Sequence, residues 1–394
     1  MCYNNHGHCS PGDFGSGLLK VLWAHGQSDT FMYHGSTRGT GGIAFYGTVN
    51  NNFNDPDTEP PFLFPNAYTI TAEETVYHDA TYNLPSNVGC ISVIGFDHQL
   101  NPQTAKYVHH FVVYGTRKES DGKDVTEIVW AWAPGVAPLV VPKEAALLFG
   151  TCGYYKTRMN VHYNNPAGTG VGMVDTSGVK VYWTKKKRPH TAGIITLGDV
   201  IVTQKIPIPQ GFGLSTYHYD CPADCTKHLT EPLNVYGIMQ HMHSTGKQTI
   251  TTHWRGDKRL PDLGRTDFFN FNFQTTMLKH ATIMPGDSLR TSCTFKQRSD
   301  RETKFRDGSS DEMCVQFVYV WPRPPISYCG FARGKTTCGS GLSNPTKVDD
   351  DSVRVTTFGK KPSALVCAAE AVKNIFGQLG GGDTVVVHGR NLRH

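Results

Sequence analysis

The segment Tyr107-Val-His-His-Phe-Val-Val-Tyr114 has the composition on which the fold prediction depends. It is short, rich in β-branched and aromatic residues, and has no helical period, which is typical of a core strand in a sandwich. Segments of the same kind recur between clusters of Gly, Pro and Asn, at residues 127–132, 158–163, 179–183, 200–206, 234–243 and 314–321. The pattern predicts an all-β protein built from antiparallel β-sandwiches. Helical periodicity is clear only over residues 363–378, where we expect one short helix.

Changes in composition divide the chain into parts. Residues 51–66 are polar and contain several prolines, as linkers do. Two further Pro-rich stretches, 206–211 and 322–325, separate the strand-rich segments from each other and from the tail. We therefore expect a fragment over 1–50, a linker over 51–66, one sandwich over 67–205, a second over 206–340, and a partly disordered tail over 341–394.

The charge distribution and hydropathy exclude two classes of protein. The 394 residues include 38 basic and 33 acidic side chains, and the net charge of +5 has no dominant patch. The densest basic run, Lys185-Lys-Lys-Arg188, is too short for a nucleic-acid-binding face, and we interpret it as a solvated turn. No segment approaches the roughly 18 apolar residues that a membrane span requires. We expect neither a nucleic-acid partner nor a transmembrane segment, and the oligomeric state stays open.

The cysteines indicate an oxidising compartment. There are eleven of them, more than a reducing cytosol usually holds in structural roles. No Cys-x-x-Cys pair occurs, so a zinc ribbon or a thioredoxin motif is not supported. The first 25 residues lack the basic and apolar regions of a signal peptide, and we expect the chain to begin inside a longer natural protein.

A histidine pair with a spacing of two marks the best candidate metal site. Gln240-His241-Met242-His243 lies in a strand pattern, and a strand directs residues i and i+2 to the same face. Two imidazoles that meet at one point suit zinc or copper. The alternative, two polar residues on a solvent-exposed face, is about equally compatible with the motif alone.

Four further residues are informative only in combination. His109 and His110 are neighbours, so both can reach one ion only if the strand is bulged or a ring folds back. His162, a lone strand histidine beside a turn, and Met313, at the start of an apolar strand, are more typical of core residues. A thioether beside two imidazoles would favour Cu(I).

Together these motifs resemble one known family. Val108-His-His-Phe-Val-Val-Tyr-Gly115, Val161-His-Tyr-Asn-Asn-Pro166, Met239-Gln-His-Met-His-Ser-Thr-Gly246 and Asp311-Glu-Met-Cys314 occur here in one order. The combination resembles the copper type II, ascorbate-dependent monooxygenases, in particular the dopamine beta-hydroxylase branch, over roughly residues 70–330. The resemblance implies two consecutive jelly-roll sandwiches. Upstream, Val21-Leu-Trp-Ala-His-Gly26 with Tyr33-His-Gly35 is similar to the last strands of a DOMON domain.

The resemblance also implies two copper ions and their ligands. His109, His110 and His162 would hold one copper, a distant store that passes on an electron. His241, His243 and Met313 would hold the second, at which O2 binds and the substrate C–H bond is broken, so these three would be the catalytic residues. Ascorbate is the implied electron donor.

The disulfide pattern implied by the resemblance fits the second sandwich. It pairs Cys293 with Cys314, Cys221 with Cys329, and Cys225 with either Cys338 or Cys367. The first sandwich departs from the family, because Thr116 replaces a cysteine and a cysteine-bearing insert before Trp130 is missing. We expect Cys90 to pair with Cys152 instead.

The substrate is inferred from residues that differ within the family. Peptide-amidating members have an arginine where this chain has Met239, so the grip on a peptide carboxylate is absent. We therefore expect hydroxylation of a small amine or aromatic substrate, with Asn160, Met239, Gln316 and Phe317 as candidate substrate contacts. The alternatives are a peptidylglycine-type monooxygenase and an inactive copper-binding homologue. The cysteines and the family imply a secreted protein or one in the secretory-pathway lumen.

Overall fold

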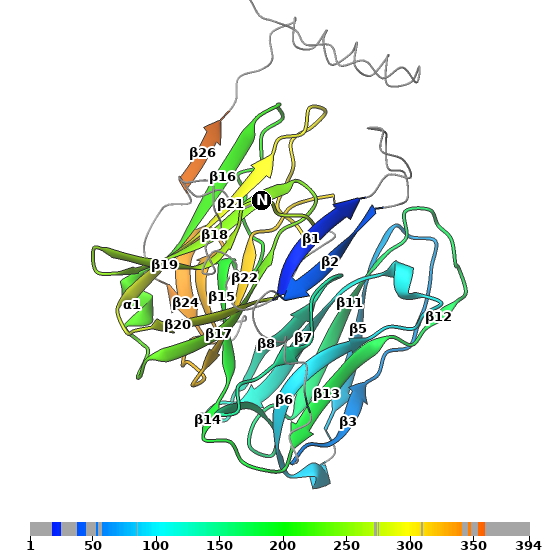
Figure 1. The fold of residues 1–394 in the computed structure, drawn as a ribbon, viewed down its shortest axis with the longest axis vertical. Helices are drawn as coiled ribbons and strands as arrows, with labels where there is room; N and C mark the ends of the chain where they lie inside the picture. Colours follow the sequence, from blue (N-terminus) through cyan, green and yellow to red (C-terminus); the bar gives the residue numbers. More distant parts are fainter. Residues whose placement is uncertain are drawn as a thin grey trace, which may run out of the picture.

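The computed structural model describes most of the chain between residues 57 and 340. The described residues are 53, 57–84, 86–271, 274, 276–308 and 310–340, together with the backbone of the strands β1 (Leu18–Ala24), β2 (Arg38–Ala44), β25 (Thr346–Lys347) and β26 (Arg354–Phe358). This part of the chain is all-β apart from the short helix α1 (Ala223–Thr226) and 3-10 turns at Ser86–Val88 and Ala105–Tyr107. It forms two β-sandwich-like domains, which confirms the all-β class and the two sandwiches; the jelly-roll connectivity stays a prediction (Figure 1).

The first sandwich consists of a six-stranded sheet and a four-stranded sheet. The larger sheet contains β3 (Glu59–Phe64), β6 (Cys90–Gln99), β9 (Leu139–Val140), β10 (Ala145–Gly150), β13 (Gly178–Thr184) and β14 (His190–Thr191). The smaller sheet has the order β5 (Thr75–Asn83), β11 (Lys156–Asn164), β7 (Val108–Lys118), β8 (Asp124–Trp132). A short pair, β4 (Tyr68–Thr69) and β12 (Val174–Asp175), lies outside both sheets.

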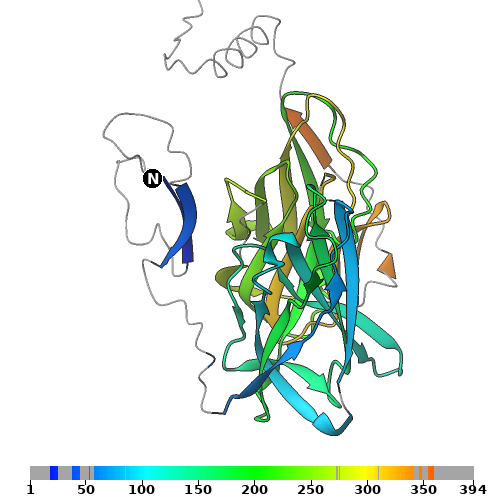
Figure 2. The same ribbon diagram turned by 90° about the vertical axis from the view of Figure 1, so that its right-hand side faces the viewer.

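The second sandwich consists of a seven-stranded sheet and a five-stranded sheet. The seven strands are β15 (Gly193–Asp199), β17 (Leu233–His241), β20 (Thr276–Ile283), β22 (Val315–Trp321), β23 (Tyr328–Ala332), β24 (Lys335–Gly339) and β25. The five are β16 (Leu214–Cys221), β18 (Gly246–Arg255), β19 (Lys258–Thr266), β21 (Asp287–Lys296) and β26. Figure 2 shows the ribbon β1–β2 apart from both sandwiches; its two strands pair only with each other among the described strands.

Two expectations about the junction between the sandwiches are wrong. β15 pairs with β22 and β23, so residues 193–199 belong to the second sandwich and not to the first. No strand forms over 200–206: the Asp199 carboxylate accepts hydrogen bonds from the backbone N–H groups of Thr203 and Gln204, and Val202 has a φ of 52°. A left-handed residue and a local cap of this kind interrupt a strand.

Two smaller differences concern a strand end and strand directions. β17 ends at His241, so His243 lies just outside its expected strand, whereas β22 begins at Val315, directly after the segment that contains Met313. The sheets are not purely antiparallel, because β10 pairs with β14, and β15 with β23, in parallel. The helix expected over 363–378 and most of the DOMON-like stretch lie outside the described residues, so both stay predictions.

A single apolar core extends across the boundary between the two sandwiches. Phe111, Trp130 and Trp132 of the first sandwich belong to the same buried cluster as Met239 and Phe317 of the second. Burial of side chains of this size contributes roughly 2–3 kcal/mol each. The strands β7, β8, β17 and β22, which carry or flank the candidate metal ligands, are therefore held against one another by packing.

The disulfide predictions are confirmed. The bonds are Cys90–Cys152, Cys221–Cys329, Cys225–Cys338 and Cys293–Cys314. The choice of Cys338 removes Cys367 as the partner of Cys225; Cys2, Cys9 and Cys367 lie outside the described residues.

Polar contacts join β7 to β8 where the family's cysteine is missing. Thr116 and Thr126 are cross-strand neighbours with their hydroxyl oxygens 2.9 Å apart. Next to them, the buried Arg117 guanidinium donates two hydrogen bonds to Glu127, at 2.9 and 3.1 Å, and the Tyr154 hydroxyl donates a third at 2.7 Å. Bidentate charge-assisted pairs of this kind fix strand geometry, so the strand that carries the histidine pair is braced without a disulfide.

Candidate metal centre

A β-bulge brings His109 and His110 to the same point. β7 and β11 pair His110 with His162 and Val108 with Tyr163, so His109 is the extra residue of β7. A bulge places two consecutive side chains opposite one residue of the partner strand and re-aims the extra one. The bulge that joint binding by His109 and His110 requires is therefore present, and His109, His110 and His162 converge.

The three histidines present their Nδ1 atoms to one another. Nδ1 of His110 lies 3.1 Å from Nδ1 of His109 and 3.3 Å from Nδ1 of His162. For metal–nitrogen bonds of about 2.0 Å, these separations correspond to angles of about 100–110° at a shared ion. Three imidazole nitrogens at such angles fit a transition-metal ion, copper included.

The protonation of these histidines favours metal binding. Burial, together with repulsion between the histidines, lowers the pKa of His109 to about 4 and that of His162 to about 3. The pKa of the fully buried His110 falls well below its usual value for the same reasons. At neutral pH all three rings are therefore uncharged and have lone pairs available for a cation.

A second pair of histidines lies at the end of β17. The ring centroids of His241 and His243 are 5.2 Å apart. His241 Nδ1 lies 2.6 Å from the side-chain oxygen of Gln274, and His243 Nδ1 lies 3.2 Å from the carbonyl oxygen of Asp311, so each Nδ1 can donate its proton. The Nε2 atoms then carry the lone pairs. Nε2 of His243 is buried and has no hydrogen-bond partner within the described residues, as an atom awaiting a ligand would be.

The buried carboxylate of Glu312 ties this histidine turn to the segment that contains Met313. One carboxylate oxygen accepts hydrogen bonds from the backbone N–H groups of His243 (2.8 Å) and Met313 (3.3 Å). The other accepts from the N–H (2.5 Å) and the hydroxyl (2.7 Å) of Thr245. Met313 itself is partly buried and lines the same cavity as His241. Glu312 thereby fixes the relative positions of the candidate nitrogen and sulfur ligands.

The loop between β19 and β20 contributes contacts that no sequence pattern indicated. The Phe271 ring stacks on His109 at 4.5 Å and lies 5.4 Å from the ring of His243. The Gln274 side-chain amide donates to the Phe271 carbonyl oxygen while its oxygen faces His241. This loop therefore contacts both groups of histidines. An isolated Phe or Gln in a loop belongs to no periodic pattern, so the aromatic residues of this loop were the only sign in the sequence that it contributes to the site.

The two groups of histidines are adjacent in the structure, while the separation of the two copper ions stays a prediction. The ring centroids of His110 and His241 are 5.8 Å apart. Both residues line a cavity of about 470 Å³ between the two sandwiches. Such a volume accommodates a small organic molecule.

Most of the residues that were expected to contact the substrate line this cavity. Asn160, Met239 and Phe317 line it. The expectation for Gln316 is wrong: its fully buried amide donates to the Thr249 hydroxyl at 3.2 Å, inside the second sandwich. Successive residues of a strand face opposite sides, so the exposure of Phe317 to the cavity directs Gln316 away from it.

Charged residues line one side of this mostly apolar cavity. Arg158 is paired with Asp79 at 2.9 Å and lies over the ring of Tyr114, with its guanidinium carbon 3.9 Å from the centroid. Asp307 also lines the cavity and has no ion-pair partner within the described residues. Burial, and then the neighbouring charge of Asp311, raise the pKa of Asp307.

Two stretches of the chain are similar to the two domains of one protein family. Residues 63–170 match the N-terminal domain, and residues 190–338 the C-terminal domain, of the copper type II ascorbate-dependent monooxygenases. Tyramine beta-hydroxylase of Caenorhabditis briggsae is 27% identical over 328 residues, 78% of this chain and 54% of that protein. Dopamine beta-hydroxylase of Canis lupus familiaris is 31% identical over 223 residues, 54% of this chain and 35% of that protein. The chain thus spans about half the length, or less, of these relatives.

One further relative and one solved structure align with most of this chain. DBH-like monooxygenase protein 1 of Gallus gallus is 24% identical over 355 residues, 82% of this chain and 57% of that protein. The solved structure of N-glycanase F aligns with 69% of this chain and 98% of its own at 10% identity and a TM-score of 0.34. This structural similarity is too low to support an inference.

Proposed function

Because this chain belongs to the copper type II ascorbate-dependent monooxygenase family, an oxidoreductase family, we propose that it hydroxylates a C–H bond of a small amine or aromatic substrate. The reaction would consume O2 and ascorbate. One oxygen atom enters the C–H bond and the other leaves as water, and two ascorbate monoanions supply the two electrons and two protons. The single observation that carries the proposal is that three Nδ1 atoms converge beside a second group of histidines. In that second group, the buried Nε2 of His243 has no hydrogen-bond partner within the described residues.

The proposal assigns two copper sites to this chain. His109, His110 and His162 would hold one ion through Nδ1, and His241, His243 and Met313 the other through Nε2 and sulfur. Bound copper would supply the one-electron chemistry that dioxygen activation requires, since it alternates between two oxidation states. The protein would keep His241 and His243 in the required tautomer through Gln274 and the Asp311 carbonyl, and would exclude bulk water with Phe271.

The lining of the cavity supports a small substrate with an apolar body. Trp132, Met239 and Phe317 present hydrophobic surface beside His241 and Met313. Apolar walls with a few polar groups are typical of sites for small organic molecules. The substrate C–H bond would lie between this surface and the proposed second copper site.

The charges beside the cavity favour an amine over a peptide carboxylate. Among the described residues, Arg158 is the one arginine that lines the cavity; it is already paired with Asp79, and Met239 adds no cation. Asp307 has no cationic partner within the described residues, so a substrate ammonium group could pair with it. This arrangement supports an amine as substrate.

The secretory pathway is the compartment that we propose for this chain. Four disulfides form and persist in oxidising compartments. Among the described residues, no helix has the length and apolar character needed to cross a bilayer.

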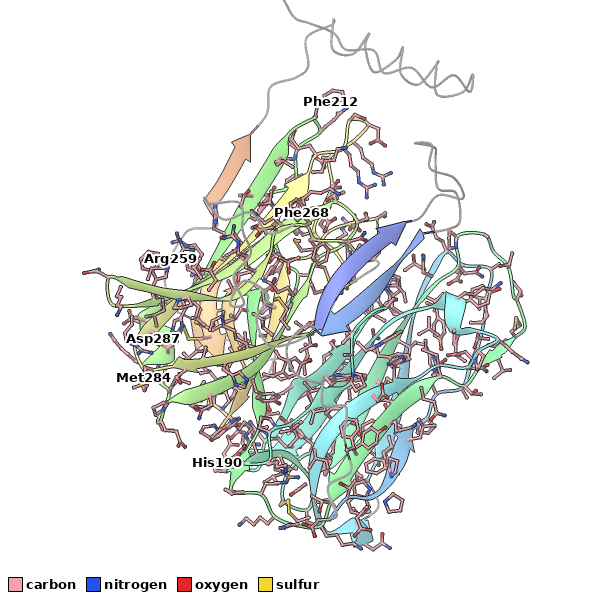
Figure 3. All side chains as sticks on the ribbon, in the orientation of Figure 1. His190, Phe212, Arg259, Phe268, Met284 and Asp287 are labelled. Carbon is pink, nitrogen blue, oxygen red and sulfur yellow. A yellow bond between two sulfur atoms is a disulfide. The ribbon has the colours of Figure 1, made fainter. Side chains whose placement is uncertain are left out.

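Metal analysis, mass spectrometry and one variant test the proposal. We expect two coppers per chain and a product 16 mass units heavier than an amine substrate when copper and ascorbate are present. Met313→Ile should abolish hydroxylation and remove one copper, while the three-histidine copper stays bound. Met284→Ile, at the turn between β20 and β21 (labelled in Figure 3), is the matched control, because Met284 does not line the cavity. Full activity of Met313→Ile would refute the assignment of the second site.

A further inference from the structure

A second cavity lies behind the turn that follows His243. Its volume is about 490 Å³, and none of its lining residues lines the cavity between the sandwiches. Three chain segments form its walls: residues 211–212, 244–247 and 296–300. Phe212, labelled in Figure 3, is one of its lining residues.

Hydrogen bonds hold these three segments together. The Gly211 N–H donates to the Arg298 carbonyl oxygen at 2.8 Å, and the Lys296 N–H donates to the Thr245 carbonyl oxygen at 2.8 Å. The buried Gln297 side chain accepts from the Gly213 N–H at 3.0 Å and donates to the Ser215 hydroxyl at 3.1 Å. The cavity is therefore defined by fixed backbone and not by the positions of mobile surface side chains alone.

Three cations and one carboxylate line this cavity. The cations are Lys247, Lys296 and Arg298, and the carboxylate is Asp300. Within the described residues, none of the three cations forms an ion pair, whereas other surface cations such as Lys118 and Lys227 do. The cavity thus carries a positive charge that an anion would neutralise.

Local geometry directs these groups toward the cavity. The pairing of β18 with β21 matches Gly246 to Phe295 and Gln248 to Thr294, so Lys247 is the extra residue of a bulge. Arg298 donates a hydrogen bond to the Ser244 hydroxyl at 3.1 Å, which anchors its guanidinium beside the turn. Hydroxyl and cationic donors therefore lie side by side.

The cavity shares a wall with the second histidine group. Thr245 lines the cavity, and its N–H and hydroxyl bind Glu312. The same carboxylate accepts a hydrogen bond from the N–H of His243. A molecule in this cavity would thus lie against the turn that carries a proposed copper ligand.

We propose that this cavity binds the anionic electron donor, ascorbate, an inference that rests on the proposed function. Ascorbate is a monoanion at neutral pH and carries several hydroxyl groups, which match the lysine, arginine and serine donors of the cavity. Each ascorbate loses one electron and one proton and becomes the ascorbyl radical anion, and two such steps supply one hydroxylation. The donor therefore enters by a route separate from that of the substrate.

Direct binding to the copper-free chain tests the site without any turnover. Anaerobic equilibrium dialysis with labelled ascorbate should show binding to the parent chain at low salt, weakened by added salt because charge attraction is screened. Lys247→Gln/Lys296→Gln should weaken binding by roughly tenfold or more, the loss expected for one or two charge-assisted hydrogen bonds. Lys143→Gln/Lys258→Gln is the control, because both residues are exposed and line neither cavity.

Kinetics of the copper-loaded enzyme give a second readout. The Lys247→Gln/Lys296→Gln variant should have a raised KM for ascorbate, while its rate with an uncharged hydroquinone donor should equal that of the parent. Equal ascorbate binding by the variant and the parent would overturn the proposal, as would equally tight binding of sulfate at the same site. Absence of hydroxylation with every donor would instead refute the proposed function and would leave the dialysis result standing.

Discussion

Replacement of Glu312 by Gln tests the brace between the two parts of the second histidine group. The carboxylate accepts two hydrogen bonds on each oxygen, from His243 and Met313 on one side and from Thr245 on the other. Glutamine offers one accepting oxygen and one donating amide. In its better orientation the oxygen serves Thr245, and two backbone N–H groups then face an N–H2 group. A buried donor without a partner costs about 1–3 kcal/mol. Because the Met313 hydrogen bond is already long at 3.3 Å, its loss falls at the lower end, and we expect a total loss of about 2–4 kcal/mol in the free energy of unfolding.

Urea denaturation of the copper-free chain measures this loss, and the metal content of the loaded chain measures its effect on the site. A total stability of roughly 5–15 kcal/mol would still leave Glu312→Gln folded, with the second copper bound more weakly than in the parent. Glu302→Gln, an exposed residue of the same loop, should change the unfolding free energy by less than about 0.5 kcal/mol. If Glu312→Gln were as stable as this control, the carboxylate would not hold the backbone N–H groups and the reasoning would be refuted.

Three further predictions concern stability. Arg117→Met leaves the buried carboxylate of Glu127 without its cation and should cost about 3–5 kcal/mol in urea unfolding, and the double change Arg117→Met/Glu127→Met should recover part of that loss. Burial raises the pKa of Asp199 to about 6, so the folded state holds an extra proton between about pH 4 and 6. The free energy of unfolding therefore falls as the pH rises through this window, and Asp199→Asn should remove this part of the pH dependence of the urea midpoint. Gly198→Ala should lower the melting temperature, with a loss of about 2–4 kcal/mol, because φ is +91° and the new Cβ would lie 2.2 Å from the Cys314 carbonyl oxygen.

Local patterns were sufficient to predict the strands that carry the histidines. β7 and β11 appear in the sequence as short apolar segments, and the adjacency of His109 and His110 already required a bulge for joint binding, which the register of β7 and β11 provides. A spacing of two likewise predicted that His241 and His243 share a side. The two rings do lie close together, with centroids 5.2 Å apart, although His243 lies beyond the end of the strand.

Features that depend on tertiary contacts could not be predicted in this way. A strand pattern does not specify its sheet, which is why β15 was placed in the wrong sandwich. The apolar residues of 200–206 resembled a strand, but the Asp199 carboxylate captures two backbone N–H groups that a ladder would have used. Phe271 and Gln274 are isolated loop residues, and their contacts with the histidines depend on where the loop packs.

The common core of the two sandwiches explains how two separate ligand groups become one site. The three-histidine group is built on β7 and β11, and the second group on β17 and the segment before β22, yet the rings of His110 and His241 are only 5.8 Å apart. Five imidazoles therefore lie close together, and they repel one another least when they are neutral. Burial lowers the pKa of each of them, which keeps the rings uncharged. The packing energy of the shared core holds this arrangement together, and a bound cation would relieve its unsatisfied lone pairs. Metal binding and docking of the sandwiches should therefore stabilise each other, because each requires the same interface.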